Sequence, residues 1–328
     1  MFSKLVGIDL GTANMLIYVK DQGVVLDEPS VVALDAETGR SLAVGQEAKA
    51  MLGRTPGQVL AIRPLKDGVI ADFEVTEMLL SSFIKKLKLK GVFSRPIILI
   101  CCPSNITSVE RNAIRDAAYR AGAKKVYIEE EPKIAALGAG LDIAKPSGNL
   151  VLDIGGGTTD VAVISLGEIV TSTSLKTAGD KLDRDLIKYV KDTYKLLIGD
   201  RTSEEIKTTI GIAWPGISSE TLSISGRDLV TGLPHSVVMK AEETELAMRE
   251  SLQEIVRACR TVLEQTPPEL SADIINTGVM LTGGGALLEG LDELLAQELN
   301  IPVFVADNAL TCVAEGTGIM LDNLHIFK

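Results

Sequence analysis

The sequence predicts an α/β fold made of two related halves, and three observations indicate it. A pattern of apolar strand, Asp, turn with Gly and Thr, and returning apolar strand occurs twice, at 5–19 and at 149–165. Strand patterns alternate with helix patterns between and after the two copies, as expected where helices pack on a sheet. The 328 residues are 46% hydrophobic and only 4% aromatic, so the chain can bury two substantial cores.

The copy at 149–165, NLVLDIGGGTTDVAVIS, is typical of a hairpin that binds phosphate. Its glycines, Gly155, Gly156 and Gly157, let backbone N–H groups approach an oxyanion that a Cβ would keep away. Asp153 precedes them and would repel phosphate unless a hydrated cation lay between, which favours a Mg²⁺–nucleotide ligand. Taken alone, an ordinary tight β-hairpin explains this stretch equally well.

The copy at 5–19, LVGIDLGTANMLIYV, decides in favour of phosphate binding. It has the same order of features, with Asp9 before the turn and Gly11 and Thr12 within it. A chance pair of glycine turns would not be expected to carry matching aspartates. The two hairpins therefore predict a duplicated domain that holds phosphates from two sides.

Composition excludes several classes of protein. The net charge of -11 and the sequence pI near 4.9 argue against a nucleic-acid binder. The four cysteines have no metal-binding spacing, and Cys101 and Cys102 end an apolar run, so we interpret them as reduced core residues of a cytosolic protein. The two histidines lie in no motif, so histidine-based catalysis is not expected. We expect neither a signal peptide nor a membrane-spanning helix, because no apolar run approaches about 20 residues.

The first half is predicted to continue from its hairpin through alternating strands and helices. The helix at 75–89 has apolar side chains at i, i+3, i+4 and i+7, and Pro132 suits the first turn of another helix. The polar, Gly-rich segment 35–68 is interpreted as a small inserted subdomain. The predicted elements are a strand at 23–34, a short helix at 45–52, the helix at 75–89, a strand at 97–102, a helix at 109–121, a strand at 125–128 and a helix at 133–141.

The second half is predicted to repeat this plan. Thr202 and Glu205 fit the N-cap and N3 positions of a capping box. Because parallel strands joined by helices place ligands at their carboxyl ends, we expect the nucleotide in the central cleft between the halves. The predicted elements are a strand at 168–173, helices at 179–194 and from 202, a β-rich insertion at 214–238, a helix at 242–264, a strand at 274–281, a helix at 287–299, a strand at 303–306 and a helix at 314–321.

These elements predict a division into domains. The core of domain I takes 1–34 and 69–145, and its inserted subdomain takes 35–68. The core of domain II takes 146–178 and 242–309, and its inserted subdomain takes 179–241. A C-terminal helix at 310–328 is predicted to return to domain I.

Four motifs in order carry a resemblance to a known family. They are DLGTAN at 9–14, EEEPKIAALGAG at 129–140, DIGGGTTD at 153–160 and TGGGALL at 282–288. With these motifs the chain resembles the actin-fold ATPase superfamily over essentially its whole length. Within that superfamily it is most similar to the MreB family of bacterial cytoskeletal proteins, nearest the Mbl branch. The resemblance implies the actin-like fold, with ATP or ADP and Mg²⁺ as ligands.

The resemblance also implies roles for individual residues. Asp9 and Asp153 would hold Mg²⁺ through water, and Glu131 would orient the attacking water with Thr158 beside it. The phosphate contacts would be Thr12, Ala13, Asn14, Gly156, Gly157 and Thr158. The residues that border the nucleoside would be Glu204, Glu205, Ile206 and Lys207. The residues at the adenosine would be Gly284, Gly285, Ala286 and Leu287.

For some of these residues a purely structural interpretation stays open as well. Glu131 is also explained as part of a solvated acidic run before a helix, and Thr158 as a hairpin residue that satisfies its own hydrogen bonds. Capping fully explains Glu205, so Lys207 is the stronger candidate at the nucleoside by its chemistry. The glycines at 283–285 fit a helix-entry turn, although helix N-termini bind anions readily. Asp160 is interpreted as structural and is left out of the catalytic set.

The resemblance implies a function as well. The expected protein is an ATP-binding, filament-forming bacterial actin homologue that organises cell-wall synthesis and determines rod shape, with a weak ATPase coupled to polymerisation. Its expected location is cytoplasmic and peripheral, on the inner face of the cell membrane, with itself, the anionic membrane surface and the cell-wall elongation machinery as partners. Two alternatives share the superfamily. A small-molecule kinase would need convergent polar residues outside the nucleotide motifs, and a chaperone ATPase would need a peptide-binding domain.

The segment 76–96 predicts the membrane contact. Five basic residues against Glu77 give it a charge of +4 (5 − 1), although the whole chain stands at -11. Val92 and Phe93 follow on an expected loop, and the family resemblance favours their insertion into the membrane. The alternative is that Phe93 folds onto the core and the basic residues form a solvated helix face. These basic residues are Lys85, Lys86, Lys88, Lys90 and Arg95.

Overall fold

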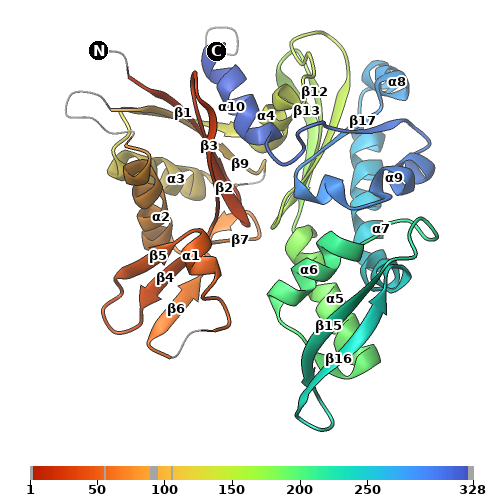
Figure 1. Ribbon diagram of the computed structural model, residues 1–328. Helices are drawn as coiled ribbons and strands as arrows, with labels where there is room; N and C mark the ends of the chain where they lie inside the picture. Colours follow the sequence, from red (N-terminus) through yellow and green to blue (C-terminus); the bar gives the residue numbers. More distant parts are fainter. Residues whose placement is uncertain (1–2, 55–56, 89–94, 105, 324–328) are drawn as a thin grey trace.

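The computed structural model describes residues 3–54, 57–88, 95–104 and 106–323, and Figure 1 shows two α/β halves side by side. The first half is built on a sheet in the order β10-β9-β1-β2-β3, and the second on a sheet in the order β13-β12-β11-β17-β18. In both, an antiparallel meander of three strands is continued by two parallel strands beside its first strand. The repeated topology confirms the predicted duplication. The strands are β1 (Leu5–Leu10), β2 (Asn14–Val19), β3 (Gly23–Pro29), β9 (Ile97–Cys102), β10 (Lys125–Glu130), β11 (Asn149–Ile154), β12 (Thr159–Ser165), β13 (Glu168–Leu175), β17 (Val279–Thr282) and β18 (Val303–Val305).

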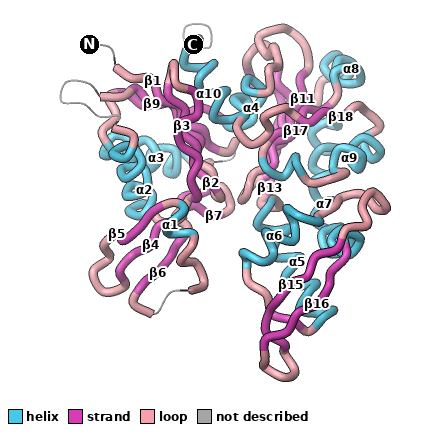
Figure 2. Tube along the Cα trace, viewed as in Figure 1, coloured by secondary structure: helices cyan, strands magenta, loops and turns pink. Residues whose placement is uncertain are grey.

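Helices cover the outer faces of the two sheets and fill the space between them (Figure 2). On the first sheet lie α2 (Phe73–Lys86), capped by the Asp72 side chain, and α3 (Ser108–Ala121), which starts with a capping box. The second sheet carries α7 (Ala241–Gln265), α8 (Pro268–Thr277) and α9 (Leu291–Leu299). Between the halves lie α4 (Glu131–Gly138) and α10 (Cys312–Asp322), as Figure 1 shows.

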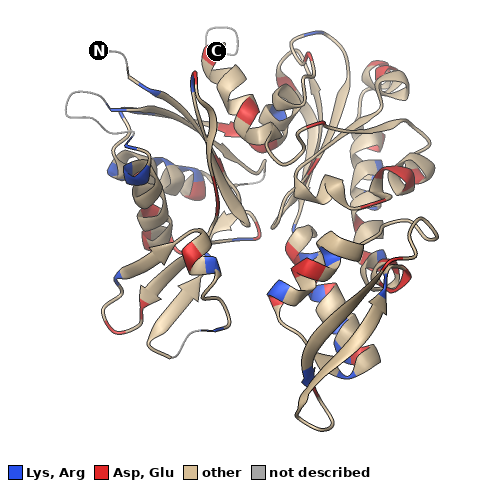
Figure 3. Cartoon of the chain, in the orientation of Figure 1, with Lys and Arg blue, Asp and Glu red and all other residues tan. Residues whose placement is uncertain are grey.

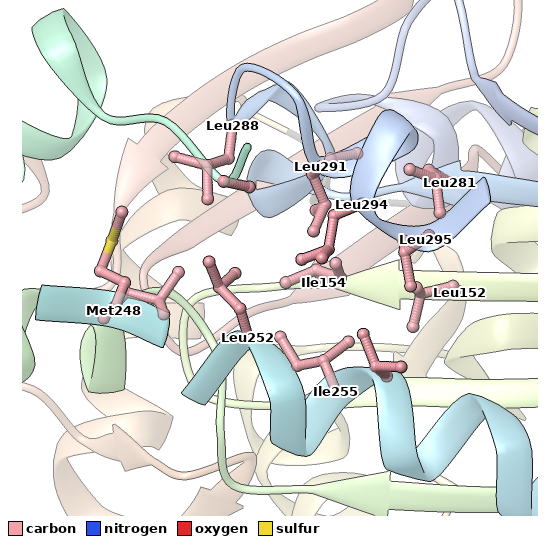
Figure 4. Packing of buried hydrophobic residues seen from close by; sticks show 14 of the residues in the cluster. Leu152, Ile154, Met248, Leu252, Ile255, Leu281, Leu288, Leu291, Leu294 and Leu295 are labelled. Atoms are coloured by element: carbon pink, nitrogen blue, oxygen red, sulfur yellow. The ribbon is translucent and has the colours of Figure 1, made fainter. Parts of the chain in front are cut away.

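Alternation along the strands gives each sheet an outer and an inner face. In β11, Leu152 and Ile154 point to the outer core, where they meet leucines of α7 and α9 (Figure 4). Val151 points the other way, into the core that α4 and α10 share with both sheets. In β1, Val6 and Ile8 likewise face the outer core with α2 and α3. The inner faces therefore look toward each other across α4 and α10.

The contact between α4 and α10 depends on glycine. A Cβ on Gly138 would lie 1.8 Å from the carbonyl oxygen of Cys312, and a Cβ on Gly316 2.0 Å from that of Ile134. Both obstacles are backbone atoms, so a side chain cannot be accommodated by a change of rotamer. The two helices approach closely at the junction of the halves.

We expect Gly138→Ala to lower the free energy of unfolding by about 1–3 kcal/mol, because the added methyl group forces α4 and α10 apart. Urea unfolding followed by circular dichroism measures the change. Gly57→Ala is the matched control, since a Cβ there meets nothing within 4 Å. Equal stability of the two variants would contradict this account of the junction.

Each half carries an inserted subdomain below its sheet in Figure 1. The first contains the small sheet β5-β4-β6, helix α1 and the two-stranded β7-β8 hairpin. The second contains α5, α6 and the sheet β14-β15-β16. Their elements are β4 (Val32–Asp35), β5 (Ser41–Val44), α1 (Gln46–Lys49), β6 (Val59–Ile62), β7 (Leu65–Lys66), β8 (Val69–Ile70), α5 (Gly179–Tyr194), β14 (Leu196–Leu197), α6 (Asp200–Ile210), β15 (Thr221–Asp228) and β16 (Pro234–Lys240).

Two predictions fail in these subdomains. The single strand at 23–34 is two strands, because Ser30 leaves the ladder and bonds to the turn of the first hairpin, with its hydroxyl on the Gly11 carbonyl at 2.7 Å and its N–H on that of Ala13 at 2.9 Å. The capping box at Thr202 is also wrong, because α6 already begins at Asp200, after Gly199. The first turn of α6 contains Asp200, and an acidic residue there favours the helix N-terminus. The capping-box pattern at Thr202 therefore placed the start of the helix too late in the sequence.

Three further boundaries differ in the regions around the later motifs. The predicted strand at 274–281 is the end of α8, which stops at Gly278 (φ 71°), followed by β17. The predicted helix at 287–299 is a 3-10 turn, η1 (Gly284–Leu287), and then α9, separated by Gly290 (φ 77°). A glycine with positive φ lies at each break: Gly278 follows the end of α8, and Gly290 precedes the start of α9. Helix α4 begins at Glu131, two residues before the prediction, so Glu131 itself stands in its first turn.

All four cysteines are buried and free, in agreement with their interpretation as core residues. None of the helices in the described part of the chain is both long and apolar enough to span a bilayer.

Candidate functional site

The turns of the two hairpins meet between the halves. A Cβ on Gly156 would lie 2.6 Å from the Cβ of Ala13, and a Cβ on Gly157 2.4 Å from the hydroxyl of Thr12. Side chains at either glycine would push the hairpins apart, so these positions need glycine. The sequence predicted that both turns belong to one site, and the structure brings them into contact.

Strand alternation directs the acidic residues of both hairpins into this junction. Asp9 shares the inner face of its strand with Gly7, which packs against Thr317 of α10. Asp153 shares the inner face of β11 with Val151, and Asp160 lies opposite Asp153 in the ladder. The three carboxylates are 9%, 4% and 1% exposed, so the cluster is withdrawn from water.

Burial dominates the electrostatics of this cluster. It raises the pKa of Asp9 to about 8, with Asp153 and Asp27 adding repulsion. It also raises the pKa of Asp153 to about 6, against a hydrogen bond from Thr282 that lowers it. The pKa of Glu131 is held well above its usual range, mainly by desolvation. Repulsion by the carboxylates of Asp9, Asp153 and Asp160 adds to this effect. Because the carboxylates destabilise one another when ionised, the site favours a positive charge among them.

Glu131 reaches this cluster from the end of β10, at the start of α4. Glu131 is half-buried, and Asp9 and Asp153 lie close enough to raise its pKa, so it is not a freely solvated member of the acidic run. Glu130, the residue before it, is not among the charges that shift it. Glu131 is therefore set apart from the rest of the acidic run by its place in the fold.

A cation would fit here, held through water. The Oδ1 atom of Asp9 is buried and has no hydrogen-bond partner. Among the described residues, no three or more His, Cys, Asp or Glu side chains are grouped to ligate a metal directly. An orphaned carboxylate oxygen beside further carboxylates suits a hydrated divalent ion, which commonly keeps several of its waters.

The β7–β8 turn packs against the turns of both hairpins, and the sequence did not predict this contact. The N–H of Gly68 donates to the Thr12 hydroxyl at 3.2 Å. A Cβ on Gly68 (φ 77°) would lie 2.4 Å from the methyl group of Thr158. Asp160, which the sequence indicated as structural, accepts a hydrogen bond from the Ser104 N–H at 3.2 Å and so ties the second half to the first. The KDG string at 66–68 is a turn signal, so the sequence indicates the turn but not its contact with the hairpins.

A cavity of about 60 Å³ continues from the hairpins toward the inserted subdomains. Of the residues predicted at the nucleoside, Glu204 and Lys207 line it. The Nζ of Lys207 lies 2.8 Å from Asp183 and 3.0 Å from the Gly179 carbonyl oxygen, so it is held in place. Glu205 is exposed on α6, and Ile206 is buried in the core beneath it.

The four residues predicted at the adenosine form η1, next to the end of β11. A Cβ on Gly285 would lie 2.2 Å from the Ile154 side chain, so glycine allows this turn to approach the strand. Ala286 is buried in the core, whereas Leu287 is 56% exposed. The segment Gly284–Leu287 therefore lies close to the end of β11, where Asp153 is located. It is not among the residues that line the cavity at Lys207.

Two ion pairs join the inserted subdomains across this region. Lys49 of α1 lies 3.0 Å from Glu204 of α6, and Arg63 lies 3.0 Å from Asp180 of α5. Figure 3 shows charges of both signs on α1 and α6. A second cavity, of about 240 Å³, is also lined by Arg63 and Asp180. The sequence did not predict either pair, because the partners come from opposite halves.

Comparison with known proteins decides the family. The family model described as "MreB/Mbl protein" matches residues 3–328. The chain belongs to the MreB/Mbl family. It is 62% identical to the cell shape-determining protein Mbl of Bacillus subtilis (strain 168), over 99% of this chain and 97% of that protein. It is 52% identical to the cell shape-determining protein MreB of Escherichia coli (strain K12), over 99% and 95%. This agrees with the predicted resemblance to MreB, nearest the Mbl branch.

Solved structures confirm the actin-like fold of this MreB/Mbl chain. MreB 5 of Spiroplasma citri bound to AMPPNP superimposes with a TM-score of 0.95 at 41% identity, over 99% of this chain and 98% of that one. The same protein bound to ADP gives 0.94. The MamK double helical filament gives 0.85 at 21% identity, over 98% and 99%, and shows the shared fold.

Val92 and Phe93, the predicted membrane residues of this MreB/Mbl chain, lie outside the described residues. Near them, Lys86 pairs with Glu28, and Arg95 donates to the carbonyl oxygens of Gly122 and Ala123. Lys85 and Lys88 are exposed. Part of the basic charge of the segment therefore has partners within the protein.

Proposed function

We propose that this chain is an ATP-binding, filament-forming bacterial actin homologue that determines cell shape. One observation carries the proposal: two glycine hairpins meet around buried carboxylates, in a chain 62% identical to a cell shape-determining protein. The AMPPNP and ADP bound to a relative 41% identical support a nucleotide ligand. Nothing favours the small-molecule kinase.

Sedimentation tests this function. We expect the purified chain to pellet at high speed with ATP and Mg²⁺ and to stay in the supernatant without nucleotide. A kinase would instead release ADP in response to an added sugar or other small hydroxyl compound. Failure to pellet under any nucleotide condition, together with such substrate-dependent ADP release, would overturn the proposal.

The contact between the hairpin turns and the cavity at Glu204 and Lys207 support a division of roles within the site. Thr12, Ala13 and Asn14 contact the phosphates from one side and Gly156, Gly157 and Thr158 from the other. Glu204 and Lys207 border the nucleoside, with Glu205 and Ile206 beside them on α6. The segment Gly284–Leu287 supports the adenosine. Asp9 and Asp153 hold Mg²⁺ through water, and the ion, when bound, neutralises charge on the phosphates.

Glu131 orients the water that attacks the terminal phosphate, with Thr158 beside it. Burial and the neighbouring carboxylates raise the pKa of Glu131, which makes it a stronger base than an ordinary carboxylate. Phosphoryl transfer depends on positioning and electrostatics, so a single well-placed carboxylate accounts for a slow ATPase coupled to polymerisation.

The ion pairs Lys49–Glu204 and Arg63–Asp180 close the cleft over the nucleoside. We expect Arg63→Asp to release a fluorescent ATP analogue about two- to five-fold faster, since each partly exposed pair contributes about 0.2–1 kcal/mol. Stopped-flow displacement by unlabelled ATP measures this rate. Combining Arg63→Asp with Asp180→Arg should restore the parental rate. Lys66→Asp, on an exposed neighbour, is the control, and an equal acceleration there would contradict a specific pair.

We further propose that filaments lie on the inner face of the cell membrane and organise the cell-wall elongation machinery there. The segment around Val92 and Phe93 provides the contact with anionic lipid. One buried Phe contributes about 1.5–3 kcal/mol and each nearby basic residue about 1 kcal/mol. A subunit therefore binds weakly, and a filament with many copies binds strongly.

We expect Val92→Ser combined with Phe93→Ser to leave sedimentation with ATP intact and to release filaments from anionic liposomes. Flotation of liposomes with bound protein measures the loss. Leu42→Ser is the control, since this exposed apolar side chain lies on the inserted subdomain. If the double variant floats as the parent does, the contact lies elsewhere.

A further inference from the structure

The residue before the three glycines of the TGGG motif bonds to a carboxylate of the cluster. Thr282 ends β17 and stands opposite Asp153 in the parallel ladder with β11. Its hydroxyl donates to Asp153 Oδ1 at 2.7 Å. Thr282 is 0% exposed and Asp153 4%, so water does not compete for this bond. A hydrogen bond to a charged acceptor in such surroundings is among the stronger ones.

The next residue leaves room for the same carboxylate. Gly283 has φ 78°, and a Cβ there would lie 2.4 Å from the carbonyl oxygen of Ile154 and 2.9 Å from Asp153 Oδ1. A side chain at Gly283 would collide with the backbone of β11 and displace the Asp153 carboxyl. Thr282 therefore holds this carboxyl from one side, and Gly283 makes its position possible.

Asp9, the corresponding residue of the first hairpin, has no such support, because its buried Oδ1 lacks a hydrogen-bond partner. The two halves are duplicated in topology but differ at this point. Among the described residues, only the second half restrains its carboxylate in this way, through the TGGGALL motif. Any backbone carbonyl could accept a hydrogen bond from the Thr282 hydroxyl. Its bond to Asp153 instead restrains a carboxylate of the cluster.

We propose that Thr282 is a positioning residue for the divalent cation: it holds Asp153 by Oδ1, so that Oδ2 remains available to accept hydrogen bonds from water on the ion. This inference rests on the proposed function, in which Asp153 holds Mg²⁺ through water. The TGGGALL motif then acts at two places, through Thr282 on the metal carboxylate and through Gly284–Leu287 toward the adenosine.

The test compares Thr282→Val, which keeps the shape and removes the hydroxyl, with Thr282→Ser, which keeps the hydroxyl. Titration of Mg²⁺ into protein with a fluorescent ATP analogue gives the half-saturating Mg²⁺ concentration. Binding of the same analogue in EDTA gives the metal-free affinity. We expect Thr282→Val to raise the half-saturating concentration about 10- to 100-fold, as is usual when a group that orients a metal ligand is removed. Thr282→Ser should stay near the parent, and the metal-free affinity should not change.

A purely structural role predicts a different pattern, and the controls separate the two. Thr266→Val removes another buried hydroxyl, which donates to the Val262 carbonyl oxygen on α7. It should lower stability without changing the half-saturating Mg²⁺ concentration. If Thr282→Val does not fold, Thr282→Ala replaces it with the same expectation. A parental Mg²⁺ requirement in the folded variant, or an equal shift in Thr282→Ser, would overturn the proposal for Thr282 alone. A parent whose nucleotide binding ignores Mg²⁺ would overturn the metal role of Asp153 and this inference with it.

Discussion

Glu131→Ala should abolish most ATP turnover while leaving nucleotide binding nearly intact. Loss of a positioned group that takes part in proton transfer costs about 10²- to 10⁴-fold in rate. Binding should survive because Glu131 stands at the start of α4, whereas the hairpins carry the proposed phosphate contacts. Phosphate release in a coupled assay measures turnover, and a fluorescent ATP analogue measures affinity.

Glu130→Ala is the matched control, because this neighbour in the acidic run is not among the charges that shift Glu131. It should retain most of the parental turnover. Parental turnover in Glu131→Ala would remove Glu131 from the proposed role. Equal losses in both variants would assign the effect to the acidic run as a whole.

Asp9→Asn should stabilise the metal-free protein at high pH and abolish its stabilisation by Mg²⁺–nucleotide. The pKa of Asp9 rises from 3.8 in an unfolded chain to about 8 in the folded protein. Between these values the unfolded chain has lost the proton that the folded protein still holds, so stability falls as pH rises from about 4 to about 8. Each pKa unit corresponds to about 1.4 kcal/mol, so the total loss is several kcal/mol. Asparagine does not titrate and avoids this loss.

Thermal unfolding in EDTA across this pH range measures the effect. The variant and the parent should melt together near the acid end, and above about pH 8 the variant should melt roughly 10–20 °C higher, at about 2–4 °C per kcal/mol. Asp307→Asn, on an exposed carboxyl, should follow the parent throughout. A pH dependence that Asp9→Asn leaves unchanged would show that Asp9 titrates normally in the folded protein.

Much of the candidate site could be predicted because it lies in short continuous motifs. The hairpins at Asp9 and Asp153 have strand–turn–strand patterns, and both form as predicted. Helix and strand boundaries failed where left-handed glycines interrupt the chain, at Gly278 and Gly290, since spacing alone does not reveal φ. The capping box at Thr202 failed because an earlier acidic turn begins the helix.

The sequence did not predict the contacts between the two halves. The ion pair of Arg63 with Asp180 and the contact of Gly68 with Thr158 join residues about 90 or more positions apart. Such partners are chosen by how two domains pack, and no local pattern encodes that packing. The same holds for Asp160: the sequence indicated a structural residue but not its partner, Ser104 of the other half.

The sequence by itself determined the duplicated α/β plan, the two hairpins and the acidic residue at the end of each first strand. It could do so because period-2 alternation and glycine turns are local properties of the chain. Only the tertiary structure decided which carboxylates share one buried cluster, and so which of them change their pKa. Only it showed that Thr282 bonds to Asp153, whereas Oδ1 of Asp9 has no hydrogen-bond partner among the described residues. Desolvation and hydrogen bonding depend on the neighbours that folding brings together, and those neighbours come from both halves of the chain.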